Sequence, residues 1–86
     1  MKLSCLQEEM KRLYYERDAR RGVFATFAWL VEEVGELGEA ILKGDKRQIG
    51  EEIADVIAWV LSLANILGID VVKAFKSKYP DVKCSG

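Results

Sequence analysis

The chain has 86 residues, 13 Lys and Arg against 14 Asp and Glu, a formal net charge of −1 and no histidine. The missing histidine excludes a Ser-His-Asp or Cys-His nucleophile and any His-ligated zinc, haem or di-iron site. The near-neutral charge argues against nucleic-acid binding, which needs an excess of Lys and Arg. The length predicts a single domain over residues 1–86, which alone would bury only about 60% of its unfolded surface, so we expect self-association.

The first half of the chain predicts two helices, and the absence of strand-like alternation throughout predicts an all-α fold. Ser4 and Gln7 resemble a capping box at the start of a first helix, whose apolar stripe fades before Gly22. A second helix is expected over residues 23–43. Gly44 stands where a left-handed residue would end that helix.

The second half of the chain predicts two more helices. Asp45 is placed to cap a third helix, which we expect to run to about Leu67. Asp70 is placed to cap a fourth, short helix through Lys78, ended by Pro80 because proline cannot continue a helix. The expected architecture is therefore an antiparallel hairpin of the second and third helices, flanked by short helices.

The two central helices carry apolar residues at alternating spacings of four and three, the pattern of a coiled-coil seam. If the turn between them is tight, residues at equal distances from the turn lie opposite each other, because each residue rises about 1.5 Å. This register pairs Ile41 with Ile49, Leu37 with Ile53, Val34 with Val56, Leu30 with Val60, Phe27 with Leu63 and Val23 with Leu67.

Apolar residues also lie outside this seam on both helices. Helices that are apolar on most sides must be covered on several sides. One hairpin and two short helices cannot provide that cover. The sequence therefore predicts that hairpins from two subunits complete a four-helix-bundle core in at least a homodimer.

Four carboxylates lie beside the seam, Glu33 and Glu36 on the second helix and Glu52 and Asp55 on the third. Each pair is spaced i, i+3 and shares a helix face. The same register sets Glu36 opposite Glu52 and Glu33 opposite Asp55. All four carboxylates are therefore expected to converge.

A solvated acidic face is the alternative interpretation, and it predicts Lys or Arg three or four positions away. Glu39 and Glu51 have such neighbours, whereas the four converging acids have none. Two carboxylates about 5 Å apart repel by about 3 kcal/mol at an effective dielectric constant of about 20. Ligands that are all oxygen select a hard cation, which we expect to be Mg²⁺, with Mn²⁺ as a substitute and structural Ca²⁺ as the alternative.

The segments Glu32-Glu33-Val34-Gly35-Glu36 and Glu52-Ile53-Ala54-Asp55 resemble the EExxE…ExxD signature of the MazG-type all-α nucleoside triphosphate pyrophosphohydrolases. Further similar fragments cover most of the chain, from Arg17-Asp18 and Arg21-Gly22 to Lys78-Tyr79-Pro80. The resemblance implies Mg²⁺-dependent hydrolysis of a ribo- or deoxyribonucleoside triphosphate, non-canonical ones included, to the monophosphate and pyrophosphate. It further implies a homodimer or a homotetramer built as a dimer of dimers, with metal ligands Glu33, Glu36, Glu52 and Asp55.

Two kinds of side chain beside these ligands are candidates for catalysis and base binding. Glu32, or a non-ligating oxygen of Glu33, is a candidate general base. Trp29 and Trp59 lie opposite each other one turn beyond the acids in the expected register, where they could stack a nucleotide base or simply pack in the core.

Other candidate substrate-binding residues lie further from the acids. Asn65 could bind phosphate or base, while Lys73, Lys76 and Arg21 could supply positive charge for a triphosphate, and the two lysines could act across a subunit boundary. Solvated faces or internal hydrogen bonding are the alternatives for these residues. Two other functions stay open, a phosphoribosyl-ATP pyrophosphatase activity and a non-catalytic helical interaction module.

The cysteines and apolar segments bear on the compartment. Cys5 and Cys84 lie near opposite ends of the sequence, so we expect free thiols, with a bridge between them as the alternative. No apolar segment follows Lys2 as in a secretion signal, and the apolar stretch over 53–67 is shorter than the roughly 20 residues of a bilayer span. The sequence thus predicts a cytoplasmic protein with no membrane partner.

Overall fold

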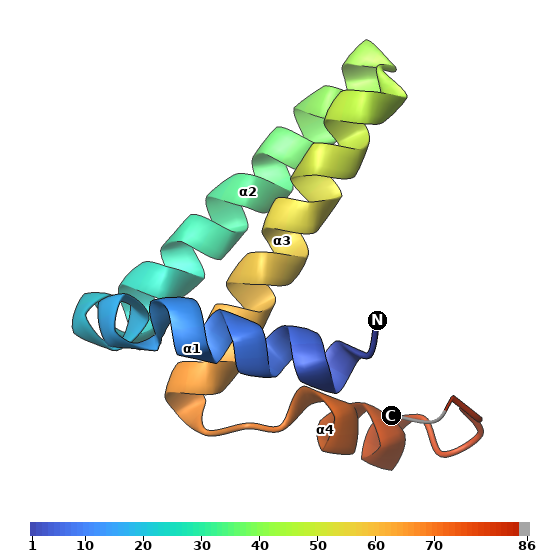
Figure 1. Cartoon of the computed structure of the whole chain (residues 1–86). Coiled ribbons are helices and arrows are strands. Elements are labelled where there is room, and N and C mark those ends of the chain that lie inside the picture. The colour runs from blue at the N-terminus through green and yellow to red at the C-terminus, as the bar shows by residue number, and fades with distance from the viewer. Residues whose placement is uncertain (85–86) are drawn as a thin grey trace.

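The computed structural model describes residues 1–84 and contains four helices, with no strand in that part of the chain. These helices are α1 (Leu3–Arg21), α2 (Val23–Lys43), α3 (Lys46–Leu67) and α4 (Val71–Lys78). The predicted all-α fold is confirmed. Figure 1 shows α2 and α3 as a long antiparallel hairpin, with α1 crossing its open end and α4 lying beside α1.

Local turn chemistry sets the hairpin's tip. Gly44 adopts a left-handed conformation with φ of +79°, and its N–H donates to the carbonyls of Ala40 and Ile41. The Asp45 side chain then accepts hydrogen bonds from the backbone N–H groups of Arg47 and Gln48. Two residues therefore end α2, reverse the chain and start α3, as the sequence predicts.

The first helix differs from expectation. It is 19 residues long, it follows Lys2, and no side chain caps its N-terminus. The predicted capping box is wrong because Gln7 is recruited by the far end of the chain: its Nε2 donates to Asn65 Oδ1 and to the carbonyl of Ile69, at 3.1 and 2.8 Å. Its Oε1 accepts from the N–H of Val71 at 3.0 Å. Gln7 thus joins α1 to α3 and α4.

Only alternate positions of the predicted seam pack between α2 and α3. Six seam residues are partly buried there: Val23, Leu30, Leu37, Ile49, Val56 and Leu63. The other six, which we call the apolar edge, are 40–56% exposed: Phe27, Val34, Ile41, Ile53, Val60 and Leu67. The predicted seam is therefore only half covered within one chain, and each predicted pair combines a partly buried residue with an exposed one.

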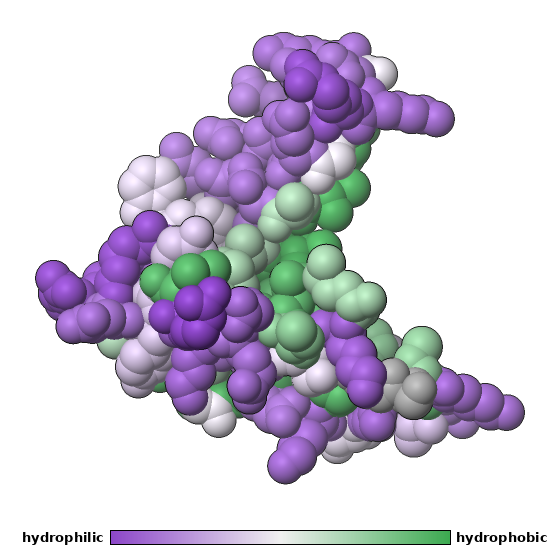
Figure 2. Space-filling model, viewed as in Figure 1, coloured by the Kyte–Doolittle hydropathy of each residue, from purple (hydrophilic) through white to green (hydrophobic). Residues whose placement is uncertain are grey.

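Little apolar surface is fully buried within one chain. Among residues 1–84, the buried hydrophobic residues are Ala40, Leu61 and Ala64. Figure 2 shows hydrophobic residues gathered in the hollow between the hairpin and the helices at its base. Much of the apolar surface of α2 and α3 therefore remains uncovered in a single chain.

Two further predictions concern the cysteines and membrane spans. Cys5 and Cys84 are exposed free thiols, so the bridge between them is not formed. No single helix of the described chain has the length and apolarity to cross a membrane; α3 and α4 pass that test only together, with a bend of 100° between them.

Candidate metal centre and active site

The facing helices bring three of the predicted ligands together. Carboxylate oxygens of Glu33 and Glu36 from α2 and Glu52 from α3 all lie within 4.8 Å of one another. Asp55 lies outside this group, although its charge acts on Glu33. Glu32 is exposed on α2 and is also outside the group. The structure therefore supplies a three-carboxylate cluster with Asp55 nearby.

The environment of Glu33 and Glu52 is unusual for acidic side chains. One oxygen of each, Oε2 in both cases, is buried without a hydrogen-bond partner. Burial raises the pKa of Glu33 to about 7, and the charges of Glu36, Asp55 and Glu52 add to the rise. Buried oxygens that accept no hydrogen bond and repel one another fit a site for a hard divalent cation, whose preferred ligands are carboxylates.

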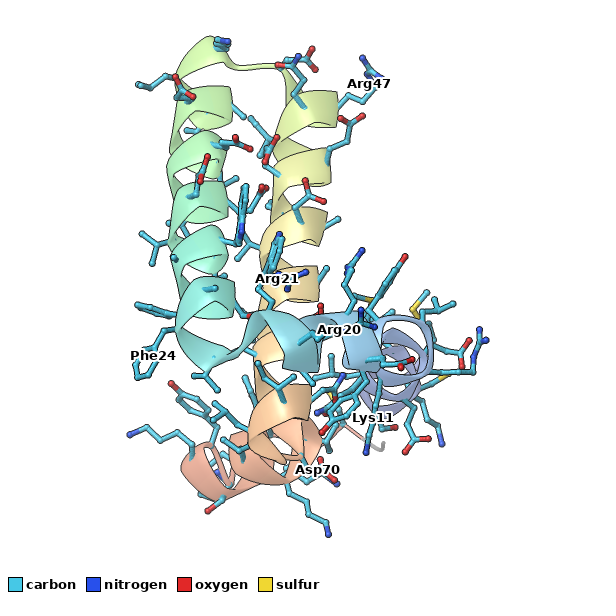
Figure 3. All side chains as sticks on the ribbon, turned by 90° about the vertical axis from the view of Figure 1, so that its left-hand side faces the viewer. Lys11, Arg20, Arg21, Phe24, Arg47 and Asp70 are labelled. Atoms are coloured by element: carbon cyan, nitrogen blue, oxygen red, sulfur yellow. The ribbon has the colours of Figure 1, made fainter. Side chains whose placement is uncertain are left out.

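The cluster and the apolar edge lie on opposite sides of the hairpin. On α2, Glu36 precedes the inward residue Leu37, whereas Val34 follows the inward residue Glu33. One residue corresponds to about 100° of helix rotation, so these two positions turn to opposite flanks. Figure 3 shows the flank with carboxylates between α2 and α3, and with Arg21 below them toward α1.

One helical turn from the acids, Trp29, Trp59 and Arg21 lie against one another on the same flank, and we call this group the aromatic column. The Trp29 and Trp59 rings are stacked, with centroids 6.0 Å apart and an angle of 11° between their planes. The Arg21 guanidinium lies over Trp59, 4.7 Å from the ring centroid. The Trp29 ring and the Arg21 guanidinium therefore both lie against Trp59, and the stacked rings leave no room for a base between them. Trp29, which is 46% exposed, keeps accessible surface.

A buried ion pair anchors this column. Arg21 Nη1 donates to Asp18 Oδ1 at 3.1 Å and lies 3.5 Å from Thr26 Oγ1. Asp18 is 1% exposed and Thr26 is fully buried. Arg21 was expected near the substrate, whereas no role was predicted for Asp18. The i, i+3 spacing of these two residues was the available signal.

Three other candidate residues are not brought to the acids within one chain. Asn65 is buried and engaged by Gln7, and ten residues of α3 set it about 15 Å along the helix from Asp55. Lys73 and Lys76 are exposed on α4, at the base of the hairpin (Figure 1). In a single chain, Asn65 therefore fastens α1 to α3, and the two lysines lie apart from the cluster.

Comparisons with known proteins place the chain in a family. Residues 22–82 match the MazG nucleotide pyrophosphohydrolase domain, a segment that contains all the acids of the cluster. A dATP/dGTP diphosphohydrolase of Cyanophage S-2L is 36% identical over 73 residues, which cover 85% of this chain and 66% of that protein. The chain therefore spans slightly less than two thirds of that relative's length.

Proposed function

This chain belongs to the MazG nucleotide pyrophosphohydrolase family, and we propose that it hydrolyses a nucleoside triphosphate to the monophosphate and pyrophosphate with Mg²⁺. The observation that carries the proposal is the group formed by Glu33, Glu36 and Glu52, with two buried oxygens that lack hydrogen-bond partners. Such a group is costly without a cation and suited to holding one.

Different acidic residues would bind the cation and accept the proton. Glu33, Glu36 and Glu52 would hold the cation, with Asp55 as a fourth ligand. A bound divalent cation offsets negative charge on phosphoryl oxygens and increases the acidity of water. Glu32 is the candidate acceptor of the proton from the attacking water, with a free oxygen of Glu33 as the alternative.

The substrate would extend from the acids toward the aromatic column. We place the triphosphate at the carboxylate cluster and the nucleoside beside Trp29 and Trp59, one turn away. Arg21 supplies positive charge at that end, although Asp18 partly neutralises it. The cyanophage relative's name makes dATP and dGTP the first substrates to test, with phosphoribosyl-ATP and non-canonical nucleotides as further arms.

We further propose that the apolar edge is covered by a second copy of the chain. Its six large residues are each at least 40% exposed on two parallel lines of one flank, as in one half of a four-helix bundle. The acids turn to the other flank and stay open to substrate. A homodimer satisfies this requirement, and pairing of dimers would give a homotetramer. Lys73 and Lys76 could then reach a neighbouring subunit's triphosphate.

Pyrophosphate release tests the activity. The full chain is assayed with each substrate, with and without Mg²⁺ or Mn²⁺. We expect Glu36→Gln and Asp55→Asn to abolish turnover while the helical circular dichroism is unchanged, and Glu39→Gln, an exposed acid on the same helix, to retain it. No turnover of any substrate, together with no metal effect on thermal stability, would instead indicate a non-catalytic module.

A further inference from the structure

A second feature of the acidic flank is a cavity between α1 and α3, with a volume of about 280 Å³. The cavity is lined from α1 by Met10, Tyr14, Arg17 and Asp18, and from α3 by Ala58, Trp59 and Ser62. The lining is thus mixed, with two aromatic side chains, two charged ones and a buried hydroxyl. Its volume and aromatic content suit a small planar ring.

This cavity is in line with the carboxylate cluster. Ala58, Trp59 and Ser62 follow Asp55 at i+3, i+4 and i+7, so they share one face of α3. The first two lie about one turn, or 5.4 Å, from Asp55 along the helix axis. A ligand held at the acids by its phosphates can therefore extend directly into the cavity.

Asp18 brings an unsatisfied hydrogen-bond acceptor to the cavity. Its Oδ1 accepts from Arg21 at 3.1 Å, whereas its Oδ2 is buried without a partner. The closest other cation, Arg17, has Nε 3.8 Å from Oδ1, too far for a hydrogen bond. Buried carboxylate oxygens without partners are rare and costly, so Oδ2 is suited to a donor that arrives with a ligand.

Arg17 is 63% exposed and lies beside the Asp18 carboxylate, with its guanidinium 4.5 Å from the Tyr14 ring centroid. The Arg17 and Asp18 side chains both line the cavity, so a ligand there can reach the Asp18 carboxylate when the exposed Arg17 side chain shifts. The Arg21 pair, only 19% exposed on the arginine side, would stay in place and hold the carboxylate.

We propose that this cavity binds the nucleotide base and that Asp18 selects bases carrying an exocyclic amino group. The inference rests on the proposed function, because the triphosphate is what directs the base there. An amino group donates to Oδ2, whereas a keto oxygen at the same place would face a carboxylate and be repelled. Two neighbouring arginines make a second cation at Asp18 unfavourable, which leaves a neutral N–H donor as the matching chemistry.

Matched nucleotides that exchange an exocyclic amino group for a keto oxygen, and the adjacent ring nitrogen for a ring N–H, test the proposal. Tryptophan fluorescence, to which Trp59 at the cavity contributes, is titrated with dAMP against dIMP and with dCMP against dUMP in the presence of Mg²⁺. Hydrogen bonds to charged groups predict that the amino member binds about tenfold tighter. In Asp18→Asn, the amide can still accept from Arg21 and offers a donor in place of Oδ2, so the preference should vanish or reverse.

A second variant tests the cavity independently of Asp18. Ala58→Leu should fill it and weaken binding of all four monophosphates at least fivefold, while inhibition of turnover by tripolyphosphate, which has no base, stays unchanged. Ala28→Leu, an exposed position on α2, is the matched control and should change neither.

Several results would overturn the proposal. These are equal binding of amino and keto partners by the native chain, an unchanged preference in folded Asp18→Asn, or unaltered nucleotide binding in Ala58→Leu. Equal binding is also the result expected if Asp18 accepts a hydrogen bond from the sugar, because the paired nucleotides carry the same sugar. If pyrophosphate is released from nucleotides but these binding tests fail, the activity stands and only the base assignment falls.

Discussion

Replacing Glu33 with glutamine should stabilise the metal-free protein and weaken its response to metal. The substitution keeps the shape of the side chain and removes one of the charges that converge within 4.8 Å. At that separation two unit charges repel by about 3.5 kcal/mol at an effective dielectric constant of about 20. Since the cluster opens to water on one side, we expect a gain of about 1–2 kcal/mol at pH 8, or roughly 4–16 °C in Tm.

The raised pKa of Glu33 sets the direction in which stability changes with pH. The folded-state pKa of Glu33 is raised from 4.5 to about 7, so the folded chain binds this proton more tightly than the unfolded chain. Stability of the metal-free protein should therefore fall as pH rises from about 4.5 to about 7, and then level off. Glu33→Gln should flatten that slope, and its advantage should shrink at pH 5.

Thermal denaturation followed by circular dichroism, in EDTA and in millimolar Mg²⁺ or Mn²⁺, measures these effects. The native chain should gain Tm on adding metal, because a ligand that binds the folded state stabilises it. The variant should gain much less. Glu39→Gln is the matched control, with an unchanged metal response. A variant that is less stable than the native chain in EDTA at pH 8, or that keeps the full metal response, would refute the idea of a shared cation.

Three other predictions concern assembly and packing. Val34→Glu combined with Val60→Glu puts charges on the apolar edge and should give a folded monomer in size-exclusion chromatography with light scattering; a dimer that persists would place the interface elsewhere. If a lysine acts across the interface, mixing Glu36→Gln subunits with Lys76→Gln subunits should restore part of the pyrophosphate release that each lacks alone, and no recovery would place Lys76 outside the neighbouring site. Asn65→Ala removes the hydrogen bonds that Asn65 makes with the side chain and the carbonyl of Gln7, and should lower the free energy of unfolding by about 1–3 kcal/mol with KM unchanged, whereas a raised KM with normal stability would give Asn65 a role in binding.

Structural features that depend on residues close together in the chain were predictable from the sequence. Gly44 and Asp45 reverse the chain through their own conformation and side chain, and Asp70 caps α4 by accepting from the backbone of Lys73. The i, i+3 spacing and a tight turn likewise predicted that Glu33, Glu36 and Glu52 meet.

Features that depend on how α1 crosses the hairpin were not predictable. Gln7 looked like a local cap because its partners, Asn65 and Ile69, are about sixty positions away. Asp18 is buried because α1 lies across α3, and the sparse apolar stripe of α1 fades before it reaches that contact. Arg21 was expected at the substrate, but its stacking on Trp59 depends on the same crossing.

The opposite orientation of the two flanks limits which insertions and deletions the hairpin can tolerate. One residue inserted in α2 between Phe27 and Ile41 would rotate the preceding part of the helix by about 100° relative to the rest. Acids would then point into the subunit contact, or apolar residues into the cation site. A matched insertion of seven residues in each helix near Gly44 would lengthen the hairpin by about 10.5 Å and nearly preserve both flanks. Length variation among functional homologues should therefore concentrate at this turn, in whole heptads.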